Sequence, residues 1–129
     1  MIAFIAHALF VIAAWTVVIK YAFPIAYAAS EGVELTRYVM LDFWWVVHLW
    51  LGAVLLRWRR YTYALALATS VVEIAIVVTK FVLFLPDAEW SIWTASWFVN
   101  KCFVLAAFVL LLGCLLVRGA ELRARPAVA

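Results

Sequence analysis

Residues 61–85 read YTYALALATSVVEIAIVVTKFVLFL and contain two charged side chains, those of Glu73 and Lys80. The hydrocarbon core of a bilayer is about 30 Å thick, so a helix needs roughly 20 mostly apolar residues to cross it. This stretch is long enough, and its apolar residues do not alternate with polar ones as they would in a barrel strand. It therefore predicts a transmembrane helix.

Three further stretches have the same character and lie at residues 2–28, 38–56 and 90–117. They are separated by SEGVELTR, RWRR and PDAEW, which are too short to hold a domain. Of the 129 residues, 71% are hydrophobic and 13% are charged, which is too little charge to cover a water-soluble domain. We therefore expect an all-α fold, a single integral membrane domain built as a bundle of four transmembrane helices with short loops.

The basic residues predict how this bundle is oriented, because cytoplasmic loops of membrane proteins are enriched in lysine and arginine. Three arginines lie in the RWRR turn at 57–60 and three in the tail at 118–129, whereas the opposite loops hold Arg37 among four acids. Both termini are therefore expected in the cytoplasm, and the expected location is the bacterial inner membrane. Anionic lipid explains the basic turn better than nucleic acid does, so membrane lipids are the expected partners.

Two features of the sequence leave alternatives open. The tripeptide AYA at 26–28 resembles a signal-peptidase site, but the N-terminus has no basic residues and the long apolar stretch contains Lys20. The segments VVIKY at 17–21 and VVTKF at 77–81 are similar, as a duplicated helical hairpin would predict. Such matches also arise by chance in apolar chains. We expect an uncleaved first helix and leave the repeat as a hypothesis.

Charged residues inside the predicted spans need a partner, a water-filled cavity or a route to the interface. At 1.5 Å per residue from the inner end of each span, Asp42 and Lys101 lie at similar depths, roughly 22 and 24 Å. We expect an ion pair between them that either specifies packing or lines a pathway. Asn100, next to Lys101, is expected to add an interhelical hydrogen bond. Lys20 and Lys80 lie near the outer interface, where long side chains reach water.

Glu73 lies about 18 Å from the inner end of its span, near the bilayer midplane. It shares a helix face with Ala66, Ser70, Val77 and Lys80, and the small residues on this face permit close helix packing. Glu73 is therefore expected to point into the bundle or into an oligomer interface. A protonatable acid at this depth fits a proton relay or proton-coupled transport, and the alternative is a single structural hydrogen bond.

The two histidines, His7 and His48, lie roughly 10 and 13 Å from the inner face of their spans. Two imidazoles on facing helices could hold a haem b, since neutral imidazole is a suitable axial ligand. Packed or interfacial histidines are the simpler interpretation. We therefore expect no cofactor, with haem b as the alternative.

The sequence contains no C-x-x-C, H-E-x-x-H, G-x-S-x-G or glycine-rich phosphate loop, so it gives no local support for an enzyme or a metal site. Our first functional hypothesis is a subunit or accessory component of a larger membrane complex. The second is a small homo-oligomeric transporter or channel with Glu73, Asp42 and Lys101 as a polar path. The third is a haem- or quinone-binding anchor subunit. Length and span count are similar to those of four-helix multidrug exporters, fluoride channels and flippase subunits for lipid-linked sugars, but the chain has no diagnostic motif of any of the three.

Overall fold

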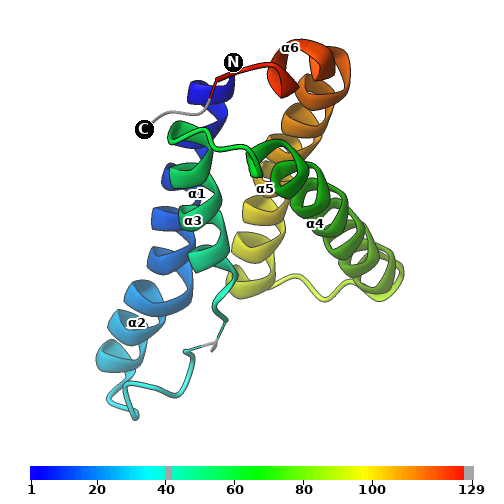
Figure 1. The fold of residues 1–129 in the computed structure, drawn as a ribbon. Helices are drawn as coiled ribbons and strands as arrows, with labels where there is room; N and C mark the ends of the chain where they lie inside the picture. Colours follow the sequence, from blue (N-terminus) through cyan, green and yellow to red (C-terminus); the bar gives the residue numbers. More distant parts are fainter. Residues whose placement is uncertain (40–41, 127–129) are drawn as a thin grey trace.

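Every regular element in residues 1–39 and 42–126, the part of the chain that this computed structural model describes, is a helix (Figure 1). Three helical segments, Ile2–Glu31, Thr62–Asp87 and Ile92–Val117, are long and apolar enough to cross a membrane. A fourth apolar helix, α3, has 13 residues. The predicted all-α class is confirmed. The elements in chain order are α1 (Ile2–Val17), η1 (Val18–Ala22), α2 (Phe23–Glu31), α3 (Trp44–Leu56), α4 (Thr62–Phe84), η2 (Leu85–Asp87), α5 (Ile92–Val117) and α6 (Gly119–Arg123).

α1, η1 and α2 form one continuous helix of 30 residues that contains a π turn. Pro24 accounts for this turn, because it has no N–H to donate and its ring would clash with the carbonyl of Lys20. The helix widens there, and the N–H of Phe23 donates to the carbonyl of Val18. Lys20, inside the widened turn, is buried. The helix ends at Gly32, whose φ of 68° is left-handed and suits glycine.

α3 begins at Trp44, so the predicted span at 38–56 is wrong at its start. Asp42 gives the physical reason: its Oδ1 accepts a hydrogen bond from the Trp44 N–H at 2.9 Å, and its carbonyl accepts one from Tyr21 Oη at 2.8 Å. Side-chain bonds to nearby backbone compete with helix formation. At 1.5 Å per residue α3 is about 20 Å long, shorter than the hydrocarbon core of a bilayer.

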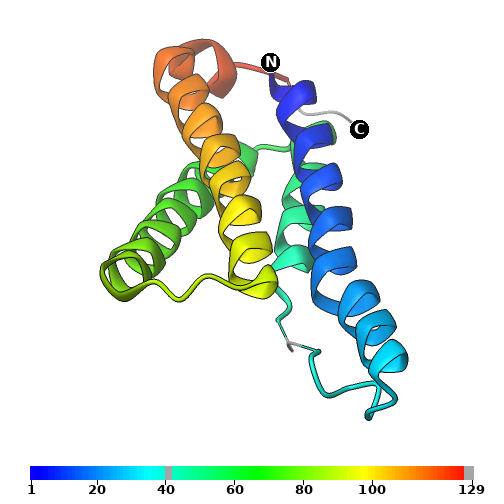
Figure 2. The ribbon, with the colours of Figure 1, turned by 180° about the vertical axis from the view of Figure 1, so that it is seen from behind.

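The helices pack as two antiparallel pairs, α1 with α3 and α4 with α5, and α1 also packs along α5 (Figure 2). Gly52 of α3 permits the first pair to approach closely, because a Cβ there would lie 2.6 Å from Phe10 Cε1 and 3.1 Å from the Ala6 carbonyl oxygen. α3 and α4 are consecutive but contact each other little, since α4 slopes away from α3 (Figure 1). The short connection between α3 and α4 therefore does not make these two helices close neighbours.

The N-terminus, the α3–α4 turn and α6 lie at the same end of the bundle (Figures 1 and 2). The predicted topology places the N-terminus, the arginine turn and the tail on one side of the membrane, and this arrangement meets that requirement. Trp58 and Leu122 are buried at this end and belong to the hydrophobic core. α6 therefore folds back over the end of the bundle.

Candidate functional site

The interior of the bundle contains polar side chains among apolar ones. Removing a polar group from water costs free energy unless it is hydrogen-bonded, and a charge needs a partner as well. The partners of these groups therefore indicate what each one does. The buried polar residues are Thr16, Lys20, His48, Thr62, Ser70, Glu73, Asn100 and Lys101.

His48 of α3 and Glu73 of α4 form a buried couple. His48 Nε2 lies 2.7 Å from Glu73 Oε1, and the two residues are 1% and 3% exposed. The His48 ring also lies against Phe108 of α5, with 5.5 Å between ring centroids. Its other nitrogen, Nδ1, has no hydrogen-bond partner within the described residues. The couple has no net charge when it holds one titratable proton. A second proton makes it a cation, and loss of the one proton makes it an anion.

Lys20 and Asp42 form a second ion pair, which corrects the expected pairing of Asp42 with Lys101. The π turn directs Lys20 into the bundle, so it does not reach the outer interface as expected. Burial by itself raises the pKa of Asp42, but hydrogen bonds from Lys20 and the Trp44 N–H, with the charges of Lys20 and Lys101, hold it below its ordinary value. Asp42 is thus a stable anion that anchors the start of α3 to the first helix.

Asn100 and Lys101 are consecutive buried residues of α5. Asn100 Nδ2 donates to Thr16 Oγ1 at 3.2 Å, while Asn100 Oδ1 has no partner among the residues that the structure describes. Lys101 is 4% exposed and makes no ion pair in residues 1–39 and 42–126. Its charge interacts with both Asp42 and Glu73 through space. Lys101 is therefore a buried amine that forms an ion pair with neither acid in the described residues.

The face of α4 that carries Glu73 is buried as predicted, with Ala66, Ser70 and Val77 on the same side. Lys80, at the end of this face, is half-buried. Sequence reasoning missed the partner of Glu73. The available signal was depth: His48 and Glu73 were placed roughly 13 and 18 Å from the inner face, a difference of about one helical turn on consecutive antiparallel helices.

The structure does not bring His7 into this cluster. Its ring is exposed, and Nδ1 lies 2.6 Å from the carbonyl oxygen of Ala3. His48 meanwhile directs Nε2 to Glu73, so the geometry gives no support to a haem held between the two histidines. Within the described residues there is also no group of three or more His, Cys, Asp or Glu side chains that could hold a metal ion.

No protein family, curated protein or solved structure matches this chain. Its class is therefore defined by the fold and the site alone. It is a small helical protein with three helices long and apolar enough to cross a membrane, and it has a buried acid, histidine and lysine at its centre.

Proposed function

We propose that this chain is an integral protein of the bacterial inner membrane and that it couples transport to protonation of the His48–Glu73 couple. The observation that supports this most is the burial of a titratable pair at 2.7 Å inside the bundle. Ionisable groups at such depth are costly, and in membrane proteins they mark ion pathways and proton relays. A purely structural role needs a hydrogen bond but does not need two ionisable side chains at this depth.

The couple has a direct means of responding to protons. Uptake of a proton by the neutral couple leaves a cation, and release leaves an anion, and either change is expensive in a low-dielectric interior. Lys101 interacts with Glu73 through space. α3 and α4 contact each other little outside this couple, so a change in its charge acts directly on the spacing of the two helices.

The charges around the couple favour an anionic cargo. Within the apolar stretches 2–28, 42–56, 61–85 and 90–117, three lysines (Lys20, Lys80 and Lys101) outnumber two acids (Asp42 and Glu73). A positive surplus attracts anions, and a proton carried with an anion reduces the charge moved across the bilayer. We therefore propose proton-linked anion transport, with Lys80 toward the outer side and Lys20 engaged by Asp42 inside the bundle.

A single copy is small for a transporter, and α4 supplies a surface for a second copy. Large apolar side chains along this helix are exposed, among them Val71, Val72, Val78, Val82 and Leu83. A homo-oligomer that covers this face would place two copies of the couple near one interface. The same face supports a second candidate function, a subunit of a larger membrane complex whose other chains cover α4.

Proton flux in reconstituted vesicles tests the proposal. The purified protein is placed in vesicles with a trapped pH indicator, and a pH gradient is applied with and without chloride or phosphate. We expect flux from the wild type and a loss of about tenfold or more for Glu73→Gln, which keeps the shape but does not titrate. Glu121→Gln, at an exposed acid outside the spans, is the matched control.

Two results would overturn transport. One is a wild-type protein that is folded in vesicles but gives no flux above that of empty vesicles. The other is a Glu73→Gln variant with wild-type flux. Mass measurement of the complex in mild detergent then separates the second candidate, because foreign chains co-purify with a subunit, whereas a transporter of this kind contains copies of this chain alone.

A further inference from the structure

Four arginines from distant parts of the chain line one cleft of about 220 Å³ at the end of the bundle. Arg59 and Arg60 belong to the α3–α4 turn, and Arg123 and Arg125 belong to the end of α6 and the residues after it. The other lining residues are Trp58, Tyr63, Ala64 and Leu122. None of the residues that line this cleft is acidic, so the four positive charges have no counter-charge within it.

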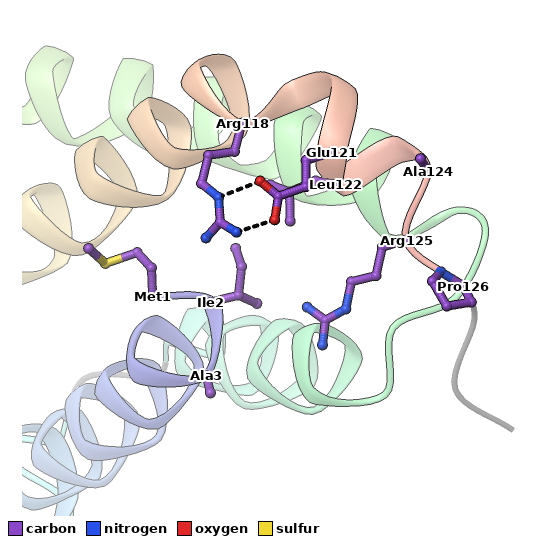
Figure 3. Close-up of a pocket in the computed structure, with 9 residues that line it drawn as sticks. All are labelled: Met1, Ile2, Ala3, Arg118, Glu121, Leu122, Ala124, Arg125 and Pro126. Atoms are coloured by element: carbon purple, nitrogen blue, oxygen red, sulfur yellow. Dashed lines mark hydrogen bonds and ion pairs between the residues drawn. The ribbon is translucent and has the colours of Figure 1, made fainter.

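The neighbouring cleft differs in this respect. It has a volume of about 560 Å³ and lies between the N-terminus and α6 (Figure 3). There Arg118 makes two hydrogen bonds to Glu121, which lower the pKa of Glu121 and raise that of Arg118. Arg125 lies apart from this pair (Figure 3). Glu121 is the only acid of α6, and because Arg118 engages it, it does not neutralise the four-arginine cleft.

Aromatic rings hold two of the four guanidinium groups in place. Arg123 lies 4.8 Å from the ring centroid of Tyr63 and contacts its hydroxyl at 3.4 Å, and that hydroxyl donates to the carbonyl of Leu115 at 2.9 Å. Arg125 lies 5.2 Å from the ring centroid of Trp58, which is 2% exposed. Both rings are fixed by the core or its backbone, so the two cations are positioned before any ligand arrives.

We propose that this cleft binds the phosphate of an anionic phospholipid. Planar guanidinium groups bind phosphate oxygens in a bidentate manner, and a phosphate relieves the repulsion between the four arginines. The two helices that lead to this end of the bundle finish on exposed apolar side chains, Leu56 in α3 and Val117 in α5. Headgroups lie at this boundary, which favours a lipid over a free phosphate ion. The proposal rests on membrane insertion but not on transport by the His48–Glu73 couple.

Native mass spectrometry from detergent tests the cleft. The full chain is titrated with phosphatidylglycerol, phosphatidylcholine or inorganic phosphate, and bound adducts are counted. We expect phosphatidylglycerol to be retained, and Arg60→Gln/Arg123→Gln to lower its affinity by about tenfold or more. The matched control is Arg37→Gln/Arg57→Gln, which removes the same charge from exposed arginines outside the cleft and is expected to change affinity by about threefold or less.

Any of the following three outcomes contradicts the proposal. An equal loss in both double variants shows general attraction to net charge. Equal retention of phosphatidylcholine shows no headgroup preference, and binding of inorganic phosphate without the lipid shows a free-ion site. The Tm of each variant without lipid verifies folding. Glu73→Gln is expected to bind phosphatidylglycerol like the wild type, so failure of transport and failure of this site are separate results.

Discussion

His48 and Glu73 meet at 2.7 Å, although the two helices that carry them contact each other little. Each residue is almost completely buried, and α5 contributes Phe108 to the same place. This couple is thus the main polar link between the α1–α3 pair and α4. Its loss is expected to affect both the stability and the activity of the protein, and these effects can be separated by choice of variant.

Replacing His48 with alanine should destabilise the protein, because it leaves the Glu73 carboxyl buried without a partner. The expected loss is about 3–5 kcal/mol, as for other buried pairs broken from one side. His48→Gln can still donate to Glu73 and should lose about 1 kcal/mol. Reversible unfolding in mixed detergent measures both free energies. Equal losses in the two variants would mean that packing, and not the hydrogen bond, accounts for the effect.

The ion pair of Lys20 and Asp42 predicts a specific pH dependence of stability. The pKa of Asp42 is lowered from its ordinary value of 3.8 in the folded state, so the folded state favours the anion. Its contribution is present above pH 3.8 and is lost as the pH falls below it. Asp42→Asn should lower the free energy of unfolding at pH 7 by about 1–3 kcal/mol and remove this part of the acid response.

Chemical denaturation between pH 2.5 and 7, about the range in which aspartate titrates, provides the measurement. Asp87→Asn is the control, because Asp87 is an exposed acid at the end of the segment Thr62–Asp87 and takes part in none of the ion pairs described above. If Asp42→Asn keeps the full acid response of the wild type, the ion pair does not contribute to stability in solution.

Two glycines offer a matched test of helix packing. A Cβ at Gly52 would lie 2.6 Å from Phe10 Cε1, whereas a Cβ at Gly113 meets no heavy atom within 4 Å. Gly52→Ala should therefore push α1 and α3 apart and cost about 1–3 kcal/mol. Gly113→Ala should add about 0.5–1 kcal/mol, because alanine is the better helix former. Thermal unfolding of the two variants gives the comparison, and a stabilised Gly52→Ala would contradict the observed packing.

Site-directed labelling tests the shared end of the bundle. Single cysteines at Arg59 and Ala124 in a chain with Cys102 and Cys114 replaced by alanine should react with a membrane-impermeant maleimide from the same side of sealed vesicles. A cysteine at Glu34, in the opposite loop, should react only from the other side. Labelling of positions 59 and 124 from different sides would contradict both the fold and the proposed orientation.

The helical class and much of the burial pattern could be predicted from residue order alone. Long apolar runs require helices, since backbone groups inside a bilayer have no water to bond. The spacing of Ala66, Ser70, Glu73 and Val77 repeats with the helical period, which predicts their common buried face.

The choice of partners required the three-dimensional arrangement, because it depends on how helices rotate and shift against one another. Pro24 and the π turn rotate Lys20 inward, and Asp42 delays the start of α3, so these two residues meet. Lys101 then remains as the buried cation without an ion pair in the described chain. Depth along a helix is a local quantity set by residue number, whereas the direction a side chain faces is set by contacts between segments far apart in sequence.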